Sequence, residues 1–425
     1  MLTLVETFDN IASPDQLANL GWSIVGLGNT GDTYNFIVAP GFGRLGTSAL
    51  GLSIDGAISC TLPPLAKSST RMIVGLAINH GLGGYSTLKF TFKRGSYVNF
   101  TVTLKFDAYA MSWNWPPTEE QDFGNILVTA CTATSGTGYP NITIPSVILP
   151  STGSHCEYTF LEVLVDCADI SNGIFKVAVN GVEYINKTGI KTTDSTGFGN
   201  DPYSVNAKYD TVTLDVTQGQ RYYTMPHPGR AYIDTIYVCD GEGGYQTDFL
   251  GPIFSKSYYP VSQGSKSNWT AIENSATTDT LHNYIVDEVS VINVESKYLE
   301  AYQDLVDELF SFGDSTVPPG YDIVSINYRT EFRNVASPGN PTPNSLVPLF
   351  KLAGNDTLKV ETKAKKLTGW TYGYLDSYYP IVPDLAIPWT PYLLEQSQFG
   401  FMLKESIWTS ITLEPLDFED SCTVE

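Results

Sequence analysis

Two carboxylates of one expected strand are the first candidates for chemistry. Glu162 and Asp166 lie in the alternating run 158–166, where period-2 spacing places both side chains on one face. A glycosidase needs two carboxylates on either side of the scissile bond, one of them kept protonated. Here Leu164 separates the two acids and no third carboxylate follows. We interpret both as polar residues on the solvated face of a strand.

Other familiar catalytic motifs are missing from the sequence. The four histidines are widely separated, and none forms a motif with Ser, Cys or Asp. The letters GxGxxG occur at 41–46, but without the strand–turn–helix context that a dinucleotide site requires. The sequence therefore predicts that the chain is not an enzyme and holds no cofactor.

Three further carboxylates gather in one turn-rich stretch. Asp240, Glu242 and Asp248 surround several glycines. Oxygen ligands on such a loop could hold Ca²⁺. Asp-Gly and Gly-Gly are also ordinary turn sequences, and we favour that interpretation. A calcium site remains the alternative.

Two tryptophans form a candidate contact surface. Trp113 and Trp115 precede two prolines and two glutamates. Exposed indole rings stack on sugar rings or anchor protein interfaces. A loop that packs under its own domain explains the same residues, so both interpretations stay open.

Length and charge restrict the kind of partner. The chain has 425 residues, which favours two domains. Its formal net charge of -21 repels phosphate backbones, so we expect no nucleic-acid partner. It contains no run of about 18 apolar residues, so we expect no insertion into a membrane.

Alternating strands dominate the expected elements. Phe100, Val102 and Leu104 alternate with polar residues. Asn180-Gly181 between two alternating runs predicts a hairpin with a type I′ turn. Apolar residues at helical spacing predict one short helix within 296–310.

A polar run divides the chain. Residues 262–267 are small and polar, as linkers are, which predicts a first domain at 1–261 and a second, β-rich domain at 268–425. Strands are expected near 323–332 and 345–352 in the second domain.

Several segments resemble one family. Residues 6–9, 42–50 and 158–182 are similar to strands of the laminin-G-like, concanavalin-type jelly roll in virion proteins of tailed bacteriophages. The most specific match is the closing segment 232–251, where an Asp-Gly-x-Gly turn precedes Asp-Phe-Leu-Gly.

The resemblance implies an all-β chain, with an N-terminal concanavalin-like jelly-roll sandwich followed by a smaller β-rich domain. It also implies a structural protein of the virion, on an exposed appendage such as a tail fibre, neck or capsid decoration. Expected partners are other virion proteins, further copies of the chain and possible host-surface glycans. The alternatives are a lectin-type adhesin and, as the weakest, a jelly-roll glycosidase.

Overall fold

A computed structural model describes most of the chain. The described residues are 2–8, 11, 17–18, 20–26, 36–40, 44, 48–52, 57–65, 67–79, 86–108, 123–132, 138–148, 158–167, 172–193, 208–218, 231–254, 258, 260–273, 276–277, 297–301, 307–312, 317, 321–334, 344–356, 358–359, 365–367, 372–383, 385–404, 411–413 and 423–424. They form two compact units, Met1–Ile253 and Phe254–Glu425. Within the described residues, no helix is long and apolar enough to span a membrane.

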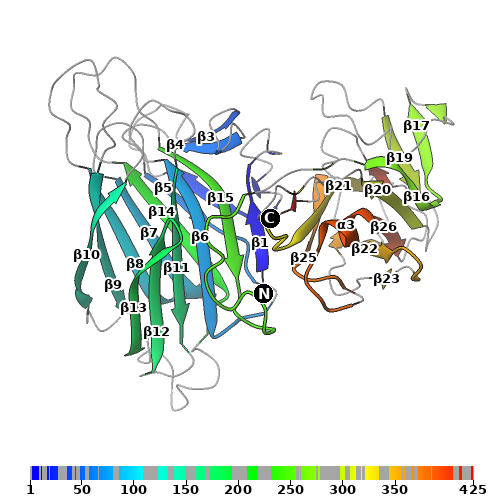
Figure 1. Cartoon of the computed structure of the whole chain (residues 1–425). Coiled ribbons are helices and arrows are strands. Elements are labelled where there is room, and N and C mark those ends of the chain that lie inside the picture. The colour runs from blue at the N-terminus through cyan, green and yellow to red at the C-terminus, as the bar shows by residue number, and fades with distance from the viewer. Residues whose placement is uncertain are drawn as a thin grey trace, which may run out of the picture. The chain divides into compact units, whose positions relative to one another are not determined.

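The first unit contains two antiparallel sheets (Figure 1). The first, here the β6 sheet, has the order β13-β12-β11-β6-β15-β4-β3, with β1 also paired to β15. Its strands are β1 (Leu2–Glu6), β3 (Phe36–Pro40), β4 (Ser48–Leu52), β6 (Arg71–Asn79), β11 (Thr159–Asp166), β12 (Gly173–Val179), β13 (Val182–Ile190) and β15 (Ala231–Cys239). The second, here the β8 sheet, has the order β10-β9-β8-β7-β14-β5-β2. Its strands are β2 (Ser23–Gly26), β5 (Ala57–Thr61), β7 (Ser86–Arg94), β8 (Tyr97–Ala108), β9 (Phe123–Thr132), β10 (Gly138–Ile148) and β14 (Thr211–Gln218).

The core of this unit lies between the two sheets. Alternate residues of β7 and β8, including Phe90, Phe100 and Val102, are fully buried. The ring of Phe100 on β8 meets that of Phe175 on β12, with centroids 5.7 Å apart. The all-β sandwich predicted from the sequence is confirmed.

The predicted hairpin is also confirmed. Val179 pairs with Val182, and Asn180 and Gly181 have φ angles of 51° and 79°. Two positive φ values in succession define the type I′ turn. The Asn180 side chain accepts a hydrogen bond from the Phe160 amide at 2.8 Å, which ties the turn to β11.

The second unit is built from two further antiparallel sheets. One has the order β16-β20-β26-β22-β23 with β24 on β22, and the other β18-β17-β19-β27-β21-β25 with β28 on β21. Their strands are β16 (Pro260–Ser267), β17 (Thr270–Glu273), β18 (Ala276–Thr277), β19 (Lys297–Ala301), β20 (Asp307–Phe312), β21 (Ile326–Asn334), β22 (Asn344–Leu352), β23 (Leu358–Lys359), β24 (Lys365–Leu367), β25 (Tyr372–Tyr379), β26 (Ser397–Lys404), β27 (Ile411–Leu413) and β28 (Thr423–Val424); α3 spans Pro391–Glu395. An aromatic core around Trp269, Phe350 and Phe399 fills the unit.

Two sequence predictions fail in this unit. The polar run 262–267, predicted as a linker, lies in strand β16 and pairs with β20, and the chain divides after Ile253 instead. Most side chains of β16 are exposed or partly exposed, so its sequence resembles that of a linker although its backbone pairs with β20. The helix predicted within 296–310 is absent from the described residues 297–301 and 307–310, which lie in strands β19 and β20 and pair with β17 and β26.

Candidate functional site

The predicted tryptophan site lies outside the described residues. Trp113 and Trp115 both fall in the gap between β8 and β9. The three acidic residues of the possible calcium site are described, and they lie in the segment that follows β15.

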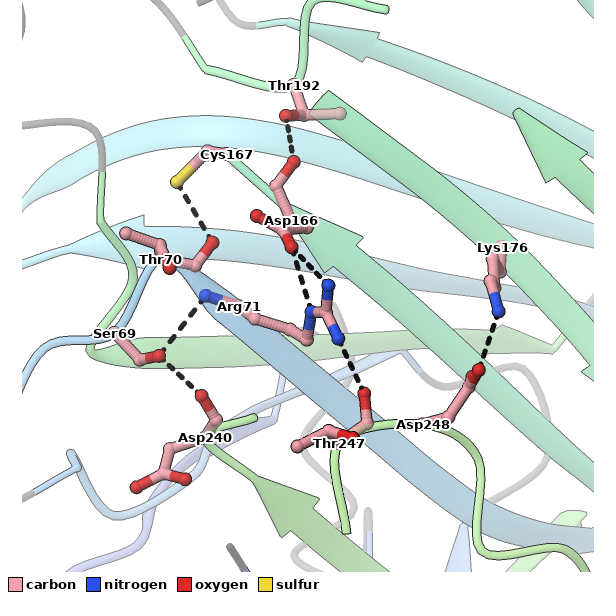
Figure 2. Close-up of polar contacts among 10 residues, drawn as sticks. All are labelled: Ser69, Thr70, Arg71, Asp166, Cys167, Lys176, Thr192, Asp240, Thr247 and Asp248. Atoms are coloured by element: carbon pink, nitrogen blue, oxygen red, sulfur yellow. Dashed lines mark hydrogen bonds and ion pairs between the residues drawn. The ribbon is translucent and has the colours of Figure 1, made fainter. Parts of the chain in front are cut away.

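That segment, Asp240–Ile253, folds back over the outer face of the β6 sheet, and we refer to it as the covering segment. Two basic side chains from the sheet hold it (Figure 2). Arg71 on β6 donates to the carbonyl oxygen of Thr247 at 2.8 Å, and Lys176 on β12 pairs with Asp248 at 2.7 Å. Near its start, the Ser69 hydroxyl donates to the carbonyl oxygen of Asp240.

The three carboxylates have separate partners. Asp240 accepts from the amide of Glu242 at 2.9 Å, as in an Asx turn. Glu242 pairs with Lys67 at 3.4 Å, and Asp248 with Lys176. Among the described residues, no three His, Cys, Asp or Glu side chains are grouped to hold a metal ion. The turn interpretation stays a prediction that metal removal can test.

The electrostatics of Asp248 agree with this anchoring role. Partial burial alone would raise the pKa of Asp248, but hydrogen bonds from Lys176 and the Phe249 amide, together with the nearby charges of Lys176 and Arg71, hold the pKa below its usual value. The ammonium of Lys176 also lies 5.9 Å from the centre of the Phe249 ring. One lysine therefore holds two consecutive residues of the covering segment.

Glu162 and Asp166 share a face, as predicted, but that face is not solvated. Glu162 is fully buried, and Asp166 is 5% exposed. Asp166 accepts two bonds from the Arg71 guanidinium, at 2.6 and 2.8 Å. The covering segment lies over these side chains, so the interpretation of a solvated face is wrong.

Glu162 anchors the far end of the covering segment. Its Oε1 accepts from the hydroxyl of Tyr237 and from the amide of Gly251 at 2.9 Å. Its Oε2 is buried without a hydrogen-bond partner among the described residues. Burial raises the pKa of Glu162 above its usual value, although both hydrogen bonds act in the opposite direction.

The opposite side of the unit carries a different surface. We call it the threonine face, defined by the odd-numbered residues of 59–61, 87–93, 101–105, 127–131 and 211–217. These side chains point away from the core, because the even-numbered neighbours such as Leu88, Leu104 and Leu214 are fully buried. Most carry a hydroxyl group, and β-branched threonine suits a pleated surface.

Strand pairing aligns these hydroxyl groups into rows. Thr213 on β14 lies opposite Thr61 on β5 and Thr91 on β7, and Thr91 lies opposite Thr101 on β8. The Thr61 and Thr213 hydroxyls are hydrogen-bonded at 2.9 Å. Opposed side chains on one face have Cβ atoms about 4.5–5.5 Å apart, so the row is continuous across four strands.

A second row carries charge. Asp215 lies opposite Ser59 on β5 and Lys89 on β7, and Lys89 lies opposite Thr103 on β8. Asp215 accepts from the Ser59 hydroxyl at 2.6 Å and pairs with Lys89 at 3.6 Å. A hydroxyl, a carboxylate, an ammonium and a second hydroxyl group therefore follow one another along the row.

The two ends of the threonine face differ in exposure. Thr91 and Thr213 are 6% and 4% exposed, whereas Lys105 and Thr217 are open to solvent. The hydroxyl of Thr91 is buried and has no hydrogen-bond partner within the described part of the chain. A buried hydroxyl without a partner costs about 1–3 kcal/mol.

Comparisons with known proteins find solved structures with a similar fold but no family to which the chain can be assigned. No family model matches the chain, and no curated protein matches it. The matching solved structures include the alginate lyase Aly36B, at 12% identity over 55% of this chain and 95% of that one, with a TM-score of 0.34. A β-glucanase of Bacillus licheniformis matches at 12% identity, 55% and 96% coverage and a TM-score of 0.33. A galectin-like protein of unknown function from Bacillus subtilis matches at 10% identity, 56% and 94% coverage and a TM-score of 0.29.

One prediction is corrected here. The sequence predicted that the chain is not an enzyme, and these matches contradict it, because they include a lyase and a glucanase. The missing motifs on which the prediction rested do not exclude activity on a β-sandwich. We therefore withdraw the exclusion and assign no reaction to the chain.

Proposed function

We propose that the first unit binds a glycan on the threonine face. The observation that carries the proposal is the alignment of hydroxyl-bearing side chains across neighbouring strands of the β8 sheet, on a face that includes the exposed side chains of Lys105 and Thr217. Sugars present many hydroxyl groups that donate and accept hydrogen bonds, and a threonine hydroxyl does both. An array of such groups held in register by paired strands suits a repeating partner.

The outer face of the β6 sheet is a poorer candidate. Over β6, β11 and β12 it is occupied by the covering segment, which uses Arg71, Glu162 and Lys176 as anchors. A ligand there would have to displace these bonds, whereas Lys105 and Thr217 of the threonine face are already exposed.

The test is a glycan array screened with the intact chain, followed by affinity measurement on the best ligand. Thr103→Val keeps the side-chain shape and strand propensity but removes one hydroxyl of the face. Thr188→Val makes the same change at an exposed position of β13, in the other sheet. We expect weaker binding for Thr103→Val and unchanged binding for Thr188→Val. Binding that neither variant alters would contradict the proposed face, and soluble products should be assayed in parallel to detect cleavage.

We also propose that this binding takes place at the surface of a tailed-phage virion, in a homo-oligomeric appendage that touches host glycans. The support is the resemblance of the closing segment 232–251 to virion jelly rolls. Mass spectrometry of purified particles tests it. We expect the chain in fixed stoichiometry with tail proteins, and its absence from washed particles would refute the proposal.

A further inference from the structure

The ligand class follows from the charges on the threonine face. We infer that the glycan is anionic, a polymer with carboxylate or sulfate groups, bound through Lys89, Lys93 and Lys105. This inference rests on the proposed function, because it concerns the same face.

The described charged side chains of this face are mostly positive, whereas the whole chain has a negative net charge. The protein has 45 acidic and 24 basic residues. Among the outward-facing side chains described on the threonine face, three are lysines and one is an aspartate, Asp215. A locally basic surface on an acidic protein favours an anionic partner at that surface, because the remaining surface repels it.

The lysines are arranged to contact one extended chain. Lys89 and Lys93 lie on the same face of β7, four residues apart, which is about 13 Å along a strand. Lys105 on β8 lies opposite Thr87 on β7 and is therefore diagonally next to Lys89. Lys89 shares its charge with Asp215, whereas Lys93 makes no ion pair with any described residue.

The face also offers little for binding a neutral sugar by stacking. Of its outward-facing side chains that the structure describes, none is aromatic. Flat rings are the usual platform for the apolar face of a sugar. Hydrogen bonds from threonines and charge from lysines are the contacts that remain, and charge distinguishes anionic from neutral polymers.

The experiment compares one polymer in two charge states. The probes are a polyuronate and its carboxyl-reduced form, which keeps the length and linkage but removes the charge. Affinity of the intact chain for both is measured by isothermal titration or affinity electrophoresis, at low and at physiological salt. We expect the polyuronate to bind at least tenfold more tightly at low salt, and the difference to shrink as salt screens the lysines.

Substitutions assign the effect to the face. Lys93→Gln and Lys105→Gln should each weaken polyuronate binding about 1.5- to 5-fold, the range expected for an exposed ion pair. Lys187→Gln removes an exposed lysine on β13, in the other sheet, and should change nothing. These variants should leave binding of the reduced polymer unaltered.

The outcomes separate this inference from the proposed function. Equal binding of both polymers, weakened by Thr103→Val but by neither lysine variant, would refute the anionic ligand and leave the glycan face standing. Binding of neither polymer, nor of any array glycan, would refute both. Charge-dependent binding that Lys187→Gln weakens as much as Lys93→Gln would also overturn the inference, since general attraction would then explain it.

Discussion

The role of Glu162 as an anchor leads to a quantitative prediction for Glu162→Leu. Leucine has a similar volume, so the substitution leaves no large cavity. It removes the acceptor of two donors, the buried Tyr237 hydroxyl and the partly buried Gly251 amide. It also removes the buried Oε2, which has no described partner.

These effects oppose one another. A donor left without an acceptor inside a protein costs about 1–3 kcal/mol, so these two cost about 4 kcal/mol at the middle of that range. Removal of one unpaired buried oxygen returns about 2 kcal/mol on the same scale. The net expectation is a loss of about 2 kcal/mol in the free energy of unfolding, or about 30-fold in the equilibrium constant.

Hydrogen exchange of the β11 and β12 amides measures this change within the first unit. We expect exchange by global opening to be about 30-fold faster in Glu162→Leu. Glu162→Gln, which keeps one acceptor oxygen, is the control and should change exchange far less. Acceleration below threefold in Glu162→Leu would refute the anchoring role.

Other predictions concern pH, the hairpin, metal and thiols. Burial raises the pKa of Glu162, so the folded state keeps the carboxyl proton to a higher pH than the unfolded chain does. The protonated carboxyl therefore adds to stability at low pH. This addition is lost as the pH rises from about 4.3, the usual pKa of a glutamate, through the folded-state pKa. Wild type should therefore lose stability relative to Glu162→Gln on going from pH 4 to 8, and an opposite slope would contradict the cause. Gly181→Val should cost about 1–3 kcal/mol in a melting experiment, because valine is strained at a φ of 79°, and its Cβ would also lie 3.3 Å from Pro252. Chelation with EDTA should leave the melting temperature unchanged, and a clear decrease would establish a metal at Asp240–Asp248. Burial raises the pKa of Cys167 to about 12, so a thiol reagent should not modify it before unfolding; rapid labelling of the native protein would contradict this.

Local chemistry was sufficient to predict part of this structure. The Asn180-Gly181 turn follows from two residues that tolerate positive φ, and the register from the alternation on either side. Strands near 323–332 and 345–352 appear as β21 and β22, shifted by a few residues at most. Such features depend on neighbours in sequence.

Predictions that depend on long-range packing failed. Alternation showed that Glu162 and Asp166 share a face, but not that the covering segment, whose Gly251 lies 89 residues after Glu162, covers it. Their charge suggested water, whereas Arg71, Tyr237 and the Gly251 amide surround them. Helical spacing in 296–310 competed with backbone pairing to strands elsewhere in the chain, and pairing prevailed.

The threonine face was visible in the sequence only in pieces. Thr101 and Thr103 alternate with buried residues of β8, which indicates an outward-facing polar side. Their alignment with Thr213 depends on β14 pairing with β7, more than 100 residues apart. A row of hydroxyls across strands is a property of sheet order, which period-2 patterning does not reveal.

The central claim is that a glycan lies across β7, β8 and β14, and a hydrogen-exchange footprint tests it most directly. The intact chain is measured with and without a saturating concentration of the tightest ligand from the array. The account predicts slower exchange in peptides covering 87–105 and 211–217, and unchanged exchange in those covering 173–190 of β12 and β13. Protection confined to β12 and β13 or to the second unit would contradict it.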